Sequence, residues 1–143
     1  MAITSAICNS FKVEILKAEH NFTASSGNTF NLALYTSSAS LGASTTAYTT
    51  SNEVSGTGYT AKGNALTSVT PTLDSSTAVC DFADTSFTSA SFTARGCLIF
   101  NDSAASDQAV CVIDFGADKT VTSGTFTIQF PTADASNAIV RIA

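Results

Sequence analysis

Short apolar runs, separated by turn-rich segments full of hydroxyl side chains, are the feature that most limits what this chain can fold into. In the clearest run, GTFTIQF, a strand would bury Phe126, Ile128 and Phe130 on one face and expose Thr127 and Gln129 on the other. The same reading predicts six strands, at residues 29–36, 77–83, 91–100, 108–115, 124–130 and 138–142.

Two of these predicted strands indicate how the sheets are arranged. The run 29–36 places Phe30, Leu32 and Leu34 on one face, whereas 108–115 is almost continuously apolar, as expected of a central strand buried on both sides. Short strands, two prolines and hydroxyl-rich turns predict a mainly β fold, an antiparallel β-sandwich or barrel of Ig-like or jelly-roll-like type. A length of 143 residues without internal repeats predicts a single domain, residues 1–143.

The apolar residues of segment 8–18, CNSFKVEILKA, fit both the period of a strand and the period of a helix. A strand would align three apolar residues: Phe11, Val13 and Ile15. A helix would align four residues on one stripe: Cys8, Phe11, Ile15 and Ala18. Several good helix formers favour the helix. We therefore expect one short N-terminal helix, capped by Asn9 or Ser10.

Charge is scarce, and hydroxyl groups take its place. Only 12% of residues are charged, whereas serine and threonine together number 42. Short polar side chains lose little rotamer entropy when they are packed, so such a surface suits a chain that lies against other subunits. A net charge of −5, with single scattered cations, excludes the basic clusters typical of nucleic-acid binding.

Membrane insertion and secretory export are also not expected. No apolar run approaches the roughly 18 residues of a spanning helix. The start MAITSAICNSFK lacks the cationic and apolar regions of a secretory signal. The glycosylation sequons at Asn21 and Asn101 are therefore interpreted as chance matches.

The four cysteines lie mostly in strand-like apolar runs, at Cys8, Cys80, Cys97 and Cys111. In such contexts a cysteine acts as a small hydrophobic residue. No pair has C-x-x-C spacing, and the single His20 cannot complete a two-histidine zinc site. We expect reduced structural thiols and no metal.

The segment 54–63, VSGTGYTAKG, superficially resembles a phosphate-binding loop. Gly56, Gly58 and Ala61 fit a relaxed dinucleotide pattern, and Gly58 and Gly63 have the glycine spacing of a P-loop. Such loops need a buried strand before them and a helix after them, and the flanking residues predict neither. The glycines are therefore expected to permit turns or bulges, and no cofactor is expected.

No catalytic constellation is evident either. A hydrolase triad needs a base, and the lone His20 at a predicted helix end is more typical of a cap or a surface residue. Paired acids could serve a glycosidase, but most of the carboxylates are interpreted as turn residues, among them Asp81, Asp84, Asp114 and Asp118. DFADTS and NDSAASD are calcium candidates that do not match an EF-hand loop. Arg95 is interpreted as a structural ion pair or an interface anchor.

Five successive blocks of the chain resemble a small virion protein family that is widespread in tailed bacteriophages. They are CNSFKVEILKAEHNFT, FNLALYTSSASLG, TTAYTTSNEVSGTGYTAKG, FTARGCLIFND and DFGADKTVTSGTFTIQFPTADASNAIVRIA. In that family NEVSGTGYTA is a characteristic segment without a known nucleotide role. Lys62 departs from the family pattern, in which a third glycine is common, and this weakens the case for a positive φ at position 62.

The resemblance implies a head decoration, or cement, protein on the outer surface of the virion. It would be made in the host bacterial cytoplasm, bind the major capsid protein and bridge capsid subunits, and a homotrimer would match the local threefold gaps between capsomers. The alternative is a tail- or fibre-associated module that binds a host receptor or glycan. Its stacking aromatics would come from Tyr35, Tyr48 and Tyr59 and from some of the phenylalanines. An enzyme acting on the host envelope is disfavoured because a base is lacking.

Overall fold

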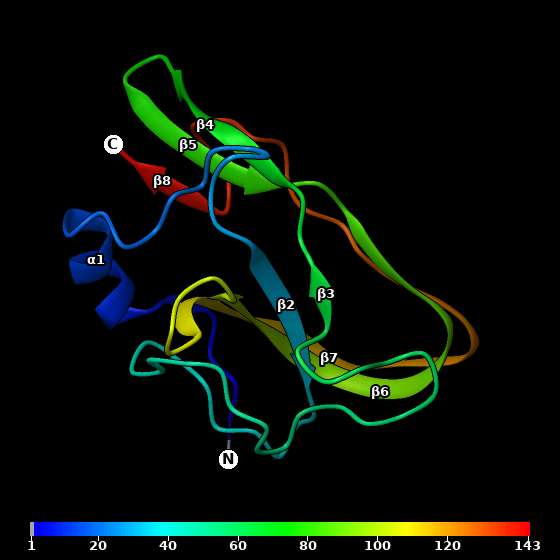
Figure 1. Ribbon diagram of the computed structural model, residues 1–143. Helices are drawn as coiled ribbons and strands as arrows, with labels where there is room; N and C mark the ends of the chain where they lie inside the picture. The colour runs from blue at the N-terminus through cyan, green and yellow to red at the C-terminus, as the bar shows by residue number, and fades with distance from the viewer. Residues whose placement is uncertain (1) are drawn as a thin grey trace.

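The computed structural model describes residues 2–143 as two antiparallel sheets and one short helix (Figure 1). One sheet has the strand order β1-β7-β6-β2-β3 and the other β4-β5-β8. The elements are β1 (Ala6–Ile7), α1 (Asn9–Leu16), β2 (Phe30–Tyr35), β3 (Asn64–Ala65), β4 (Ser68–Asp74), β5 (Thr77–Phe82), β6 (Thr85–Asn101), β7 (Gln108–Ile128) and β8 (Val140–Ile142). The predicted mainly β, antiparallel fold is confirmed, and the arrangement is consistent with a β-sandwich.

The hairpin of β6 and β7 is the longest feature of the fold, and its ladder runs from Asn101 opposite Gln108 to Thr85 opposite Ile128. Figure 1 shows it curving from the five-stranded sheet toward the β4–β5 hairpin. Several register shifts interrupt the ladder, and Gly116 within β7 has a φ of +79°. Bulges of this kind bend a strand and increase its twist.

This continuous strand corrects one prediction. The runs 108–115 and 124–130 were expected to be separate strands, but both belong to β7. The turn-like sequence between them forms the bulges. The alternation in 124–130 is confirmed, since Phe126, Ile128 and Phe130 are half-buried while Thr127 and Gln129 are exposed. These apolar residues line an open groove, and β7 ends at Ile128.

Strand β2 lies in the most deeply buried part of the five-stranded sheet. All six of its residues are buried, so the prediction of a single buried face in this run was incomplete. Beyond β3, the segment that follows β2 pairs with the free edge of this strand, with Glu53 opposite Tyr35. It is held there by a backbone hydrogen bond from Val54 N–H to Leu34 O (2.9 Å) and by a bond from the Tyr35 hydroxyl to Thr49 O (2.7 Å).

Aromatic packing joins the helix and the two sheets. Phe22 stacks on Phe30 of β2 with ring centroids 4.3 Å apart, and both rings contact Phe82 of β5. Phe11 of α1 packs against Phe22 at 5.9 Å. Large aromatic side chains contribute much of the burial energy of a core, and here they connect three elements that are distant in sequence.

Helix α1 is shorter than predicted. It begins after Cys8, which makes no side-chain capping bond, so the predicted caps at Asn9 or Ser10 are wrong. It ends at Leu16, and Ala18 has a φ of +59° that no longer belongs to a helix. The predicted helical stripe is confirmed within these bounds, because Phe11 is buried and Ile15 is half-buried.

The remaining predicted strands are found, and three strands were missed: the two-residue strands β1 and β3, and the longer β4. Runs 77–83, 91–100 and 138–142 correspond to β5, part of β6 and β8. Strand β4 was not predicted, because its sequence SVTPTLD contains Pro71 and lacks a clear apolar face. Proline is tolerated in β4 because this strand is an edge of its sheet.

All four cysteines are free and buried, as predicted. Burial raises the pKa of Cys8 to about 11 and those of Cys80 and Cys97 to about 12, and it also raises the pKa of Cys111. Because the thiolate is the reactive form, these thiols should be unreactive in the folded protein.

We predict that a thiol reagent at pH 8 labels none of the four cysteines quickly in the native protein and labels all four in denaturant without reductant. Spectrophotometric titration of both states measures this. A count near zero in denaturant would show two disulfides and contradict the assignment.

Candidate functional site

The first candidate site is a cluster of charged and phenolic side chains centred on Glu53. Its Oε1 accepts hydrogen bonds from the Tyr59 hydroxyl (2.7 Å) and from the backbone N–H of Lys62 (2.8 Å), and its Oε2 accepts one from the Tyr48 hydroxyl (2.6 Å). Both oxygens are therefore occupied by groups of this chain. The Tyr59 hydroxyl also accepts the N–H of Leu34 (2.9 Å), which ties the cluster to β2.

Lys62 extends this cluster to the turn between β6 and β7. Its ammonium nitrogen lies 2.8 Å from Asp102 Oδ1 and 2.8 Å from Asp107 Oδ2. It also lies over the rings of Tyr48 and Phe100, at 5.7 and 5.9 Å from their centroids. The hydrogen bonds to Asp102 and Asp107 raise the pKa of Lys62, so the cation is held as a fixed ion-pair partner.

The tyrosines of this cluster are poor acids. Burial, followed by the hydrogen bond to Glu53, raises the pKa of Tyr48 to about 12, and the same causes raise the pKa of Tyr59 further. A phenol with a raised pKa stays protonated at neutral pH and donates its hydrogen bond. The cluster therefore holds a loop in place and offers neither a nucleophile nor a proton-transfer group to a substrate.

The phosphate-loop interpretation of 54–63 is excluded by the local geometry, because this segment leads into strand β3 and no helix follows it. Gly58 has a φ of +79°, and a Cβ there would lie 2.7 Å from Ala90 Cα. Gly63 has a φ of +63° and passes so close to Leu32 O that no Cβ would fit. The prediction that the glycines serve the turn geometry is confirmed.

Position 62 corrects an expectation. The lysine there weakened the case for a positive φ, yet Lys62 has a φ of +73°. A non-glycine residue in this conformation is strained by roughly 1–2 kcal/mol. The ion pairs of its side chain and the hydrogen bond of its N–H to Glu53 hold it there.

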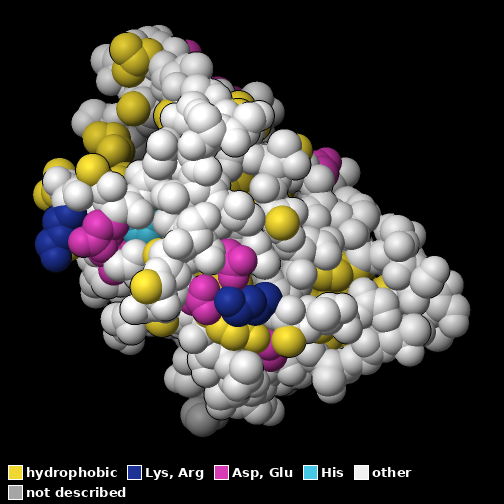
Figure 2. Space-filling model, viewed as in Figure 1, with side chains coloured by type: hydrophobic (Ala, Val, Ile, Leu, Met, Phe, Trp, Pro, Cys, Tyr) yellow, Lys and Arg dark blue, Asp and Glu magenta, His cyan; other side chains and the backbone are white. Residues whose placement is uncertain are grey.

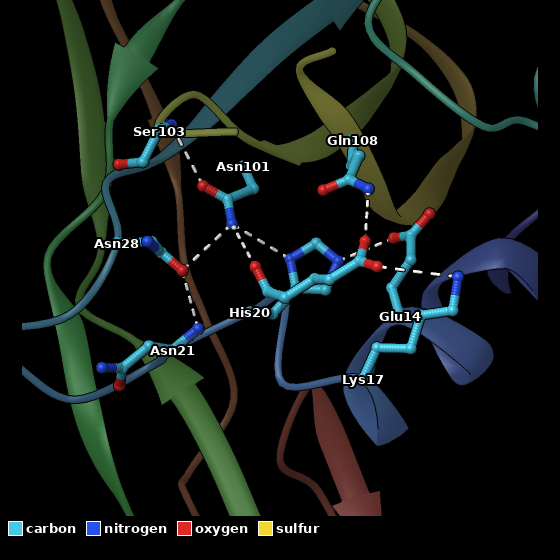
Figure 3. Close-up of polar contacts among 9 residues, drawn as sticks. Glu14, Lys17, His20, Asn21, Asn28, Asn101, Ser103 and Gln108 are labelled. Atoms are coloured by element: carbon cyan, nitrogen blue, oxygen red, sulfur yellow. Dashed lines mark hydrogen bonds and ion pairs between the residues drawn. The ribbon is translucent and has the colours of Figure 1, made fainter. Parts of the chain in front are cut away.

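The second candidate site surrounds His20 and is shown in Figure 3. The His20 side chain is fully buried, which contradicts the expectation of a cap or surface residue. Its Nε2 lies 2.7 Å from Glu14 Oε2, and its Nδ1 lies 3.1 Å from Asn101 Nδ2. A histidine between a carboxylate and a second polar group has the outline of a catalytic dyad.

The hydrogen bonds of Asn101 determine which tautomer His20 adopts. Its Oδ1 accepts the N–H of Ser103 (3.0 Å), while its Nδ2 faces the acceptors Glu19 O (3.4 Å) and Asn28 Oδ1 (3.2 Å). The amide orientation is thereby fixed, and Nδ2 must donate to His20 Nδ1. His20 therefore carries its proton on Nε2 and donates it to Glu14. The nitrogen that would act as a base is occupied and buried, so the cluster is structural.

This cluster also reaches the β6–β7 turn through surface contacts. Gln108 Nε2 donates to Glu19 Oε2 at 2.7 Å, and Lys17 lies 3.7 Å from Glu19 Oε1. Figure 3 shows these residues linking the end of α1 to the strand ends beside the turn.

The other candidate residues each have a separate local role. Arg95 Nε lies 2.8 Å from Asp114 Oδ1, which confirms the predicted ion pair, and this contact lowers the pKa of Asp114. Asp84 accepts the N–H of Phe130 (2.8 Å). Asp81 is buried and accepts the N–H of Phe82 (2.9 Å), and burial raises its pKa. Asp118 is exposed on β7.

Metal ligands do not gather in the described chain. Within residues 2–143 no group of three His, Cys, Asp or Glu side chains could hold a metal ion. In the calcium candidate NDSAASD, Asp102 and Asp107 are instead paired with Lys62. Over the same residues, no helix is both long enough and apolar enough to cross a bilayer.

Comparison with known proteins gives no assignment of the chain: no family model matches it, no curated protein is found as a relative, and no solved structure matches its fold.

His20 stands out in the sequence as the single histidine, but nothing local marks Glu53 and Asn101 as the residues that organise the two clusters. Their partners lie up to 82 residues away, as in the contact of Asn101 with Glu19 O. The only sequence signals for the Glu53 cluster were weak: Lys62 stands where a glycine was expected, and Asp102 and Asp107 lie at the two ends of a short turn.

We predict that Lys62→Ala is less stable than Lys62→Gly by about 1 kcal/mol, because both variants lose the ion pairs but only glycine adopts a positive φ cheaply. Urea unfolding measures the difference. Lys119, exposed on β7, is the matched control, where alanine should be at least as stable as glycine. The strain argument fails if the two Lys62 variants are equally stable.

We also predict that long-range ¹H–¹⁵N NMR at neutral pH finds the His20 proton on Nε2 only, because Asn101 donates to Nδ1. Asn101→Ala should abolish this preference and lower the free energy of unfolding by about 2 kcal/mol or more, since several buried groups lose their partner. Asn9→Ala, at an exposed position, should cost no more than about 0.5 kcal/mol. A proton on Nδ1 in the native protein would contradict the assigned network.

Proposed function

We propose that this protein is a non-catalytic virion component that decorates the outer surface of a bacteriophage head and binds its major capsid protein. One observation carries the proposal. Both clusters of charged and hydrogen-bonding side chains are closed among themselves, whereas large apolar side chains remain exposed at one end of the molecule, at Leu16, Leu73 and Ile142. Exposed apolar patches of this kind are typical of protein interaction surfaces.

Surface composition supports the same proposal. The outer face of the β6–β7 hairpin carries hydroxyl pairs across the strands, Ser86 with Thr127 (2.9 Å) and Thr93 with Thr120 (2.8 Å). Such short, neutral side chains pack against a neighbour at little entropic cost. A net charge of −5 is unfavourable for contact with the genome, in keeping with a place on the exterior.

A protein of this kind would act through binding energy alone. Each copy would bridge neighbouring capsid subunits, and many modest contacts would together resist the internal pressure of the DNA. A homotrimer fits this role because the gaps between capsomers have local threefold symmetry. The resemblance of the sequence blocks to small virion proteins of tailed phages motivates the proposal.

The three tyrosines give little support to the alternative, a tail-borne module that binds a glycan. A sugar-binding platform needs an exposed aromatic face, but Tyr35 is buried. The Tyr48 ring stacks on Phe100 with centroids 4.8 Å apart, and the ammonium group of Lys62 lies over its ring. The Tyr59 ring stacks on Phe87 with centroids 5.5 Å apart. These three tyrosines serve the core and the Glu53 cluster.

Copy number separates the two functions. A decoration protein occupies repeated sites over the whole shell, so densitometry of purified virions should give a ratio to the major capsid protein on the order of one to one. Heads that lack the protein should assemble but release DNA at a lower temperature, because a ligand of the assembled shell stabilises it.

A ratio below about one in ten would contradict the decoration role and favour the tail-borne module, whose copies are limited by tail symmetry. A ratio to the major capsid protein near one, together with an unchanged temperature of DNA release, would show that the protein binds the shell without stabilising it.

A further inference from the structure

One row of exposed apolar side chains crosses the three-stranded sheet. Leu73 of β4 lies opposite Ala78 of β5, which lies opposite Ile142 of β8. Residues directly opposite each other point to the same face of a sheet. Leu73 is 72% exposed and Ile142 is 57% exposed, so this row extends beyond the part of the sheet covered by the core.

Helix α1 continues this row. Leu16, at the end of the helix, is 87% exposed and lines the same hollow as Val140 and Ile142. A neighbouring hollow, between Ile15 and the sheet, shares Val140 and Ile142. We call the four residues Leu16, Leu73, Ala78 and Ile142 the apolar strip. Figure 2 shows hydrophobic side chains gathered along this edge of the molecule, over α1 and the three-stranded sheet.

The two charged residues that line the hollow beside Leu16, Lys12 and Arg141, are both cations. Just outside it the charges are mixed, since Lys17 lies 3.7 Å from Glu19 Oε1 and Asp74 directly follows Leu73. None of the residues lining the two hollows is acidic. The whole chain has 11 acidic and 6 basic residues, so a hollow lined by cations alone differs from the overall charge balance.

We infer that the apolar strip is the surface that docks onto the capsid, and that its partner is an apolar patch of the major capsid protein bordered by carboxylates. The inference rests on the proposed function and specifies its contact. Leu16 and the row across the sheet would supply the buried apolar area, and Lys12 and Arg141 would face the carboxylates, as charge complementarity requires.

The charges disfavour the other two occupants. A second copy docked strip to strip would bring its cations against those of the first copy, and like charges across an interface are repulsive. A bilayer surface is usually met by Trp and Tyr anchors, but the sequence has no Trp. Its three tyrosines pack in the core or the Glu53 cluster.

The test measures binding to shells from a phage that lacks the gene for this protein, by co-sedimentation of purified variants. Leu16→Glu and Leu73→Glu should each raise Kd by about tenfold or more, because they place a carboxylate against the partner's carboxylates. Lys12→Glu should weaken binding in the same direction. Val13→Glu is the matched control, since Val13 is 55% exposed on α1 but lines neither hollow, and its Kd should stay within about twofold.

The outcomes separate the inference from the proposed function. If the wild-type protein binds shells and the Leu16 and Leu73 variants bind equally well, the strip is not the docking surface, while the decoration role stands. If the wild-type protein does not bind shells, the proposed function fails and the inference fails with it. Two results would contradict the inference and give the strip another partner. If Leu16→Glu has a lower association state than the wild type in analytical ultracentrifugation, the strip is a contact between copies. If the wild type binds phosphatidylglycerol vesicles and Leu16→Glu does not, the strip binds a membrane.

Discussion

The pairing of β6 with β7 determines where the other elements lie. On one side β6 pairs with β2, on the other β7 pairs with β1, and the far end of the hairpin bends toward the second sheet. Both polar clusters attach to the turn that joins the two strands. Lys62 binds Asp102 and Asp107 within that turn, and His20 binds Asn101 at its start. The loop after β2 and the end of α1 are thereby held to one six-residue connection, 102–107.

This arrangement engages the polar side chains of both clusters, a histidine, a lysine and several carboxylates, within the chain itself. Every polar atom of Glu53 and of the His20 ring has a partner within the chain. Buried polar groups of this kind stabilise a fold only when they are fully paired, and paired groups are not free to act on a substrate. What remains available to other molecules is the surface outside the clusters, and there the apolar strip is the conspicuous feature.

Much of the fold could be predicted from sequence because its signals are local. The period of two in TFNLALYT and the buried stripe of α1 depend only on near neighbours. Strand β7 was divided in the prediction, because Gly116 and Ser123 look like turn residues but instead adopt positive φ within bulges. The clusters could not be predicted, because their contacts join residues far apart in sequence. Lys62, for example, contacts a carboxylate 40 residues away.

A cryo-electron microscopy reconstruction of a virion that carries the protein tests the account most directly. We expect density for the protein at repeated positions over the outside of the head, with α1 and the β4–β5–β8 sheet facing the capsid. Density confined to the tail or its fibres would contradict the decoration role. Density on the head with the apolar strip facing solvent would contradict the docking surface.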